Sequence, residues 1–301
     1  MLLQKGIVFY IKKIWNQYRT LKFELFKTIV WALSNLAKGK PTSKFCTPGL
    51  ISILSEIIIS TDNEEQLIEV IWGLSYLTQD IYEIHMQIDM KVIQKLTLLL
   101  NSTKHTLIIP ALRTIGNILA GNDEQTNQVL QTGVLQSFEK LLQHKKKSVR
   151  RDVIWSLSNI VAGTISQIKL IIRNDSLLKP LFKQAKKNNL EITKQIAFFI
   201  SNSAIYAELT DLEYLIANYG FIQELSMLLD KKDENIIQVT LEGIYKLISK
   251  IQMEGEFSVY KQIIEDQKII KKVVQLQGHP SEIIHENAYR ILDHLVPQDS
   301  Q

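Results

Sequence analysis

The sequence contains one cysteine, few glycines and few prolines. The single Cys46 excludes an intrachain disulfide and any site built from several cysteines, and it suits a reducing compartment. Six prolines and twelve glycines among 301 residues leave no Pro/Gly/Ser linker that would divide the chain into domains. No apolar run reaches the roughly 18–20 residues that cross a bilayer, and lysines interrupt the apolar start MLLQKGIVFYIKKIW. We therefore expect no signal peptide and no membrane association.

Motifs for catalysis and metal binding are also missing. The chain has no phosphate-binding loop, no dinucleotide fingerprint and no HExxH, and His279, His285 and His294 lack metal-ligand spacing. We predict that the protein is not an enzyme and that it needs no metal or cofactor. The net charge of +4 is small, so the local distribution of charge matters more than the sum.

A five-residue motif recurs along the chain at a nearly fixed interval. WALSN, WGLSY, RTIGN, WSLSN and FFISN begin at residues 31, 72, 113, 155 and 198, which are 41, 41, 42 and 43 positions apart. A period of about 40–47 residues is typical of HEAT and armadillo arrays. The sequence therefore predicts an all-α solenoid in which stacked repeats complete one another's core.

The region 124–163 shows how one repeat is built. EQTNQVLQTG predicts a short helix that ends at Gly133, VLQSFEKLLQ a second helix, and SVRRDVIWSLSNIVAG a third that ends at Gly163. Three helices per repeat indicate the armadillo pattern rather than the two-helix HEAT pattern. We expect about seven such repeats over residues 23–296, with an irregular cap at 1–22 and a tail at 297–301.

The motif places an aromatic and an amide residue on the same helical face, because residues four apart in a helix are neighbours. A lysine stem fits between two aromatic rings, with about 0.5–2 kcal/mol of cation–π energy per contact. Asparagine amides can hold the backbone of an extended peptide, and nearby carboxylates can neutralise its basic head groups. The alternative is that each tryptophan belongs to the core. The return of Asn35, Asn117, Asn159 and Asn202 argues against it, since asparagine is unfavourable inside helices.

The motifs resemble those of the importin-alpha (karyopherin-alpha) family. The resemblance rests on VWALSNLAKGKP at 30–41, WGLSYLTQD at 72–80, PALRTIGNILAGNDEQT at 110–126 and WSLSNIVAG at 155–163, and it covers residues 23–296. It implies a right-handed superhelix whose inner groove binds basic nuclear localisation signals at a major and a minor site. It also implies that the chain corresponds to the fourth to tenth of the family's ten repeats.

The resemblance assigns binding residues to both sites. The minor-type site comprises Arg113, Asn117, Asp123, Thr126, Asp152, Trp155, Asn159, Phe198 and Asn202. The residual edge of the major-type site comprises Trp31, Asn35, Glu65, Glu69, Trp72 and Tyr76. Phe198 stands where the family has tryptophan, and Gln195 stands where it has an acid, so we expect a weaker pocket there.

The resemblance also suggests partners and a location. We expect proteins with basic nuclear localisation signals as partners, the family's export receptor on the late repeats, and shuttling between cytoplasm and nucleus. The missing basic N-terminal segment argues against binding to importin-beta, and the chain is either a shortened paralogue or an incomplete gene product. Two alternatives stay open: an armadillo scaffold that has lost cargo or importin-beta binding, and nucleic-acid binding through the connector HKKKSVRR at 144–151, although we expect no nucleic-acid partner.

Overall fold

The computed structural model describes residues 10, 13, 28–29, 31–32, 34–35, 47–79, 88–187 and 189–295. Within this part all regular structure is helical, in sixteen helices without a strand. The predicted tail at 297–301, and all of the predicted cap at 1–22 except Tyr10 and Lys13, lie outside the described residues. The chain forms two compact units, Met1–Ser156 and Leu157–Gln301.

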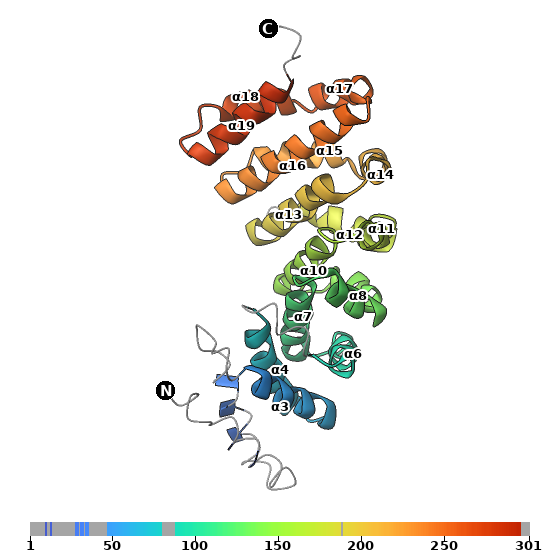
Figure 1. Cartoon of the computed structure of the whole chain (residues 1–301), viewed down its shortest axis with the longest axis vertical. Helices are drawn as coiled ribbons and strands as arrows, with labels where there is room; N and C mark the ends of the chain where they lie inside the picture. Colours follow the sequence, from blue (N-terminus) through green and yellow to red (C-terminus); the bar gives the residue numbers. More distant parts are fainter. Residues whose placement is uncertain are drawn as a thin grey trace. The chain divides into compact units, whose positions relative to one another are not determined.

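The first unit consists of two helix pairs followed by a triplet. Its helices are α3 (Thr47–Ser60), α4 (Glu64–Gln79), α6 (Met90–Leu99), α7 (His105–Leu119), α8 (Asp123–Gln131), α9 (Val134–Leu141) and most of α10 (Lys147–Ile160). Helix α3 packs on α4, α6 packs on α7, and α4 packs along α7 (Figure 1). The repeated motifs at residues 72, 113 and 155 therefore lie on α4, α7 and α10, each the last helix of its repeat.

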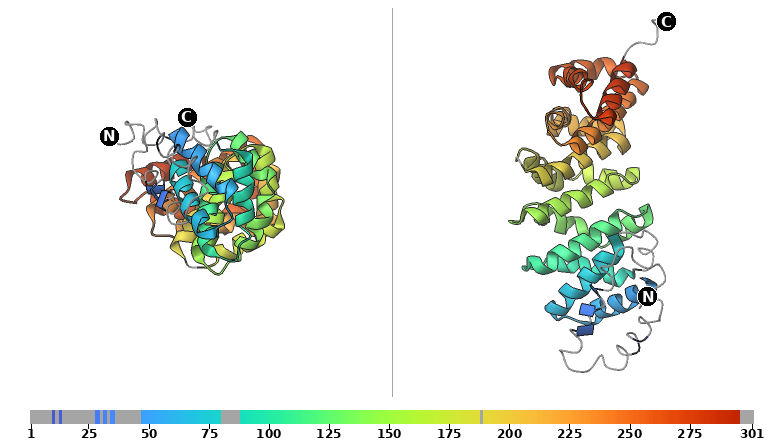
Figure 2. Two further views of the ribbon diagram at one scale, coloured as in Figure 1. Left: turned by 90° about the horizontal axis from the view of Figure 1, so that it is seen from below. Right: turned by 90° about the vertical axis from the view of Figure 1, so that its left-hand side faces the viewer.

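The second unit contains three consecutive triplets. Its helices are α11 (Ile165–Ile172), α12 (Asp175–Ala185), α13 (Leu190–Tyr206), α14 (Leu209–Tyr219), α15 (Phe221–Leu229), α16 (Glu234–Met253), α17 (Phe257–Asp266), α18 (Ile269–Leu276) and α19 (Glu282–Leu295). The third helices α13, α16 and α19 lie side by side, with α16 in contact with both neighbours (Figure 1). Figure 2 shows the same layers between residues 190 and 295 from the side.

Tight turns join the first and second helices of three triplets. Gly133 between α8 and α9 has φ 75°, and Gly220 between α14 and α15 has φ 66°. Glycine adopts this left-handed conformation without the steric cost of a Cβ atom. Lys268 occupies the equivalent place between α17 and α18 with φ 59°, and it is the only described non-glycine residue with positive φ. The prediction of a left-handed turn at Gly133 is confirmed.

Small residues allow the third helices of neighbouring repeats to approach closely. A Cβ atom on Gly73 of α4 would lie 3.1 Å from the Cα of Ser34, and one on Gly243 of α16 would lie 2.9 Å from the Cα of Ser201 on α13. Real Cβ atoms essentially never lie within 3.0 Å of another heavy atom, so a side chain at Gly243 requires the backbone of α13 to shift, and one at Gly73 is tighter than nine in ten real contacts. Ser34 and Ser201, each the fourth residue of its motif, thus pack on a glycine of the next third helix.

The three-helix organisation predicted for residues 124–163 is confirmed by α8, α9 and α10. The third helix ends at Ile160 rather than at Gly163, because the amides of Ala162 and Gly163 bond to carbonyls only three residues back. Such bonds close turns of the tighter 3₁₀ type. No helix in the described ranges is long and apolar enough to cross a bilayer.

Candidate functional site

The aromatic residues of the repeated motifs remain partly accessible on their helices. Trp31 is 58% exposed and Phe198 is 41% exposed, while Trp72, Tyr76 and Trp155 are half-buried. On α4 the rings of Trp72 and Tyr76 stack with centroids 5.8 Å apart and an angle of 24° between their planes. A large aromatic side chain that belonged only to the core would be covered more completely. The motif aromatics therefore present ring surface that a ligand can contact.

The amide of Asn117 has a structural partner that the sequence does not reveal. Asn117 is only 6% exposed, and its Nδ2 donates to the carbonyl oxygen of Ser75 at 2.9 Å and to Oγ1 of Thr78 at 3.0 Å. Both acceptors lie on α4, the third helix of the preceding repeat. The two N–H bonds of Asn117 thus join α7 to α4.

Asn202 on α13 makes the same kind of contact in the second unit. Its Nδ2 donates to the carbonyl oxygen of Ser158 at 3.0 Å. Ser158 is the fourth residue of the preceding motif, WSLSN, just as Ser75 is the fourth residue of WGLSY, the motif that precedes Asn117. Asn35 differs, because its Nδ2 donates to the Trp31 carbonyl within the same turn at 2.8 Å and its side chain is exposed. Asn159 is half-buried on α10. Asn117 and Asn202 therefore join neighbouring third helices, in addition to the binding role predicted for them.

Trp155 packs directly on the backbone of α7. A Cβ atom on Gly116 would lie 2.3 Å from Cζ3 of the indole and 3.0 Å from Oγ of Ser156. Glycine at this position is therefore required for the indole to lie where it does. The motif RTIGN supplies that glycine immediately before Asn117, so α7 carries both the support for Trp155 and the amide bonded to α4.

The acidic residues assigned to the site have different environments. Asp152 is only 7% exposed, and its Oδ1 lies 2.6 Å from Nη2 of Arg151. Burial raises the pKa of Asp152 above its usual range, and the guanidinium groups of Arg151 and Arg113 offset this only in part. Glu65 is exposed and Glu69 is half-buried on α4. Of these three carboxylates, Asp152 is the most buried.

The remaining predicted residues lie at the start of α8 and on α13. Asp123 is exposed at the first position of α8, whereas Thr126 one turn later is buried. Gln195, at the position where an acid was expected, is half-buried three residues before Phe198. Within the first unit the structure brings Arg113 near Asp152, Gly116 against Trp155, and Asn117 against α4. Within the second unit it joins Asn202 to Ser158.

Comparison with known proteins identifies the family. Residues 122–162 match the model of the Armadillo/beta-catenin-like repeat. The chain is 33% identical over 280 residues to importin subunit alpha-1a of Oryza sativa subsp. japonica, covering 90% of this chain and 53% of that protein. It is likewise 33% identical over 282 residues to importin subunit alpha-4 of Arabidopsis thaliana, covering 90% of this chain and 52% of that protein. The chain belongs to the importin-alpha family.

The chain spans about half the length of the curated relatives it matches. It also resembles a solved structure of computationally designed armadillo repeat proteins for modular peptide recognition. That likeness has a TM-score of 0.70 and 25% sequence identity, and it covers 80% of this chain and 98% of the designed one. These findings confirm the predicted all-α armadillo solenoid class and the predicted family. The relatives are named as importin subunits, which agrees with the prediction that the chain is not an enzyme.

Proposed function

We propose that this importin-alpha family member is a nuclear import adaptor that binds basic nuclear localisation signals along its third helices. Its relatives are named as importin subunits, and the designed armadillo proteins it resembles are described as made for peptide recognition. The observation that carries the proposal is a set of partly exposed aromatic residues, each followed four positions later by a polar residue, on the third helices α4, α10 and α13. A lysine stem of an extended peptide can pack on each of these rings.

Each compact unit contributes its own residues to the proposed binding. In the first unit the stacked rings of Trp72 and Tyr76 support lysine stems, and Glu65 and Glu69 neutralise their head groups. The amide oxygen of Asn117 accepts a peptide N–H, because both N–H groups of that amide already bond to α4. A lysine directed at Asp152 must compete with Arg151, so this carboxylate contributes less.

The other residues of the predicted minor-type site lie on α10 and α13. Trp155 and Asn159 lie one turn apart on α10, and Phe198 and Asn202 lie one turn apart on α13. The exposed ring of Phe198 offers a smaller surface than an indole, so we infer a weaker lysine contact there. Arg113 on α7 replaces the motif aromatic and places a positive charge near Asp152, which disfavours a lysine at that repeat.

The proposed partners follow from the same reasoning. An adaptor of this family carries cargo proteins with basic signals and acts together with an importin-beta-type receptor, so we propose passage between cytoplasm and nucleus. Recycling through contact of an export receptor with the late repeats belongs to the same proposal. Because the chain corresponds to about half of its relatives, each of these partners needs its own binding test.

The direct test is a fluorescence-anisotropy titration of the purified chain with a labelled lysine-rich signal peptide and with its alanine-substituted counterpart. We expect selective binding of the lysine-rich peptide, weakened about tenfold or more by Trp155→Ala combined with Asn159→Ala. Since Trp155 also packs on Gly116, circular dichroism must show that this variant is folded.

Two single substitutions of exposed residues distinguish a loss of peptide binding from a loss of folding. Phe198→Ala truncates an exposed motif aromatic of α13, and Tyr206→Ala truncates an exposed aromatic at the end of the same helix, outside the motif. We expect only Phe198→Ala to weaken binding. Equal binding of both peptides to the folded chain, or equal loss in both variants, would contradict the proposed function and favour a scaffold role.

A further inference from the structure

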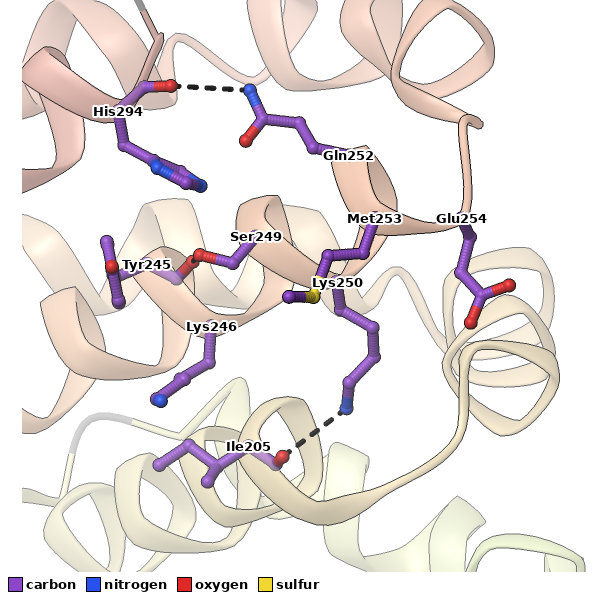
Figure 3. A pocket seen from close by; sticks show the side chains of 9 residues that line it. All are labelled: Ile205, Tyr245, Lys246, Ser249, Lys250, Gln252, Met253, Glu254 and His294. Carbon is purple, nitrogen blue, oxygen red and sulfur yellow. Dashed lines mark hydrogen bonds between the residues drawn. The ribbon is translucent and has the colours of Figure 1, made fainter.

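The second unit carries a cavity that the predicted binding site does not include. It has a volume of about 540 Å³ and lies among the C-terminal parts of α13, α16 and α19 (Figure 3). We call it the α16–α19 pocket, and its principal lining residues are Ile205, Tyr245, Lys246, Lys250, Met253 and His294. Every one of these residues follows the motif of residues 198–202 in the sequence. None of the lining residues belongs to the aromatic–amide pairs of the proposed function, and Ile205 lies one turn after Asn202 on α13.

Two lysines place positive charge on the α16 side of the pocket. Lys246 and Lys250 are one turn apart on α16 and both line the pocket, and in Figure 3 their side chains extend toward the side of Ile205 on α13. Lys250 donates to the carbonyl oxygens of Ala204 at 3.1 Å, of Ile205 at 3.3 Å and of Ala207, and so caps the end of α13. Burial, together with the charge of Lys246, lowers the pKa of Lys250. The two lysines therefore repel each other, and an anion between them would relieve that repulsion.

Further cationic and aromatic groups surround the ring of Tyr245, two of them from α19. The guanidinium of Arg290 lies 4.1 Å from the ring centroid of Tyr245, and the ring of His294 lies 5.3 Å from the same ring. Nζ of Lys246 is 5.9 Å from the Tyr245 centroid. Among the described lining residues, Glu254 is the only carboxylate. Lys246, Lys250 and Glu254 therefore give the lining residues a net charge of +1, while Glu208, Glu213 and Glu256 line an adjoining cavity that shares Lys250 and Glu254.

The same pocket also has a prominent apolar component. Met253 is 89% exposed at the last position of α16, and its thioether lies beside the pocket in Figure 3. An unbranched, polarisable side chain of this kind adapts its shape to different apolar partners. Ile205 and the ring of Tyr245 add apolar surface to that of Met253. A matching ligand thus combines a negative charge with an adjacent apolar group.

We propose that the α16–α19 pocket binds an acidic peptide segment in which a glutamate or aspartate is next to an apolar residue. The carboxylate pairs with Lys246, and the apolar side chain covers Met253. Lys246 supplies the direct charge-assisted hydrogen bond, because the three N–H groups of Lys250 already bond to the end of α13. This surface goes beyond the proposed function, since it recognises the opposite charge from a nuclear localisation signal.

The test uses the full chain and a fluorescein-labelled peptide that repeats Glu-Glu-Leu-Ser, with a matched peptide in which glutamine replaces every glutamate. We expect the glutamate peptide to bind at least about tenfold more tightly by fluorescence anisotropy, with an affinity that falls as salt is raised. Lys246→Glu should weaken binding about tenfold or more. Lys183→Glu, which alters an exposed lysine on α12 outside the pocket, is the matched control and should leave binding unchanged. Met253→Ala should weaken it about fivefold through lost apolar contact.

Several outcomes would overturn this proposal. Lys246 is exposed, so Lys246→Glu is expected to fold, and wild-type affinity in that variant would exclude the pocket. Equal affinity for the glutamate and glutamine peptides would exclude recognition of a carboxylate. An excess of the lysine-rich signal peptide should not displace the glutamate peptide, because the two ligands bind different residues. Displacement would mean that both use one surface, whereas loss of signal-peptide binding alone would contradict only the proposed function.

Discussion

Replacing Asn117 by alanine tests whether the motif asparagine stabilises the repeat stack as well as binding a ligand. The substitution removes two hydrogen bonds to α4, each of which contributes about 0.5–1.5 kcal/mol net, so the two together contribute about 1–3 kcal/mol. The carbonyl oxygen of Ser75 keeps a bond from Oγ1 of Thr78 at 3.1 Å and is not left without a donor. We therefore expect Asn117→Ala to lower the free energy of unfolding by about 2 kcal/mol.

Urea unfolding followed by tryptophan fluorescence isolates the relevant unit. All four tryptophans, at positions 15, 31, 72 and 155, belong to Met1–Ser156, so the emission reports on the unit that contains Asn117. A loss of 2 kcal/mol corresponds to a midpoint lower by about 1 M urea for a slope of about 2 kcal/mol per molar. Circular dichroism at the same urea concentrations reports on both units together.

The matched control is Asn35→Ala, which changes the same motif position where the amide bonds only within its own exposed turn. We expect a loss below about 0.5 kcal/mol for this variant. Asn117→Asp sharpens the test, because a carboxylate cannot donate to Ser75 and its burial is costly. Wild-type midpoints for both Asn117 variants would refute the assignment of a structural role.

Three further predictions concern packing, helix capping and buried charge. Gly116→Ala should displace the indole of Trp155, shift tryptophan emission and cost about 1–3 kcal/mol in urea unfolding, and an unchanged spectrum would contradict the packing. Asp233 caps α16, and its hydrogen bond from Lys194 at 2.8 Å lowers its pKa, so its stabilisation is present above about pH 4 and lost as the pH falls through the lowered value. Thermal unfolding at neutral pH should show Asp233→Ala about 1 kcal/mol less stable than Asp233→Asn, which keeps the cap; equal midpoints would disprove the capping role. Burial raises the pKa of Glu224, so its contribution to stability is present at low pH and lost as the pH rises through the raised value. Glu224→Gln should therefore raise the unfolding midpoint more at pH 7 than at about pH 4, and equal shifts would contradict this reasoning.

The helices were predictable because their signals are local in the sequence. The recurrence of the motif at intervals of 41–43 residues and the apolar spacing around Phe138 depend only on the order of residues along the chain. Gly133 was predictable for the same reason, since a glycine between two helical patterns indicates a left-handed turn. The turn at Lys268 was not, because a lysine there carries no such signal. Its conformation follows from the packing of α17 against α18.

The candidate site was predictable only in part. The residues of the aromatic–amide pairs follow from the repeat, but the partners of Asn117 and Asn202 lie 42 and 44 residues away in the sequence. The sequence predicts that Asp152 is available to a ligand, whereas in the structure it is buried and paired with Arg151. Which atoms of these side chains already have partners depends on the register between neighbouring helices. That register is a property of packing.

The sequence by itself determined the helical class, the armadillo period, the family and the positions of the motif residues, because each of these is a regularity along one chain. Only the tertiary structure decided that two amides join successive third helices, that Gly116 supports Trp155, and that Lys246 and Lys250 border a pocket with His294 of α19. These features need atoms from helices that are far apart in sequence. Their positions are set when apolar faces exclude water and close-packed helices adopt one register.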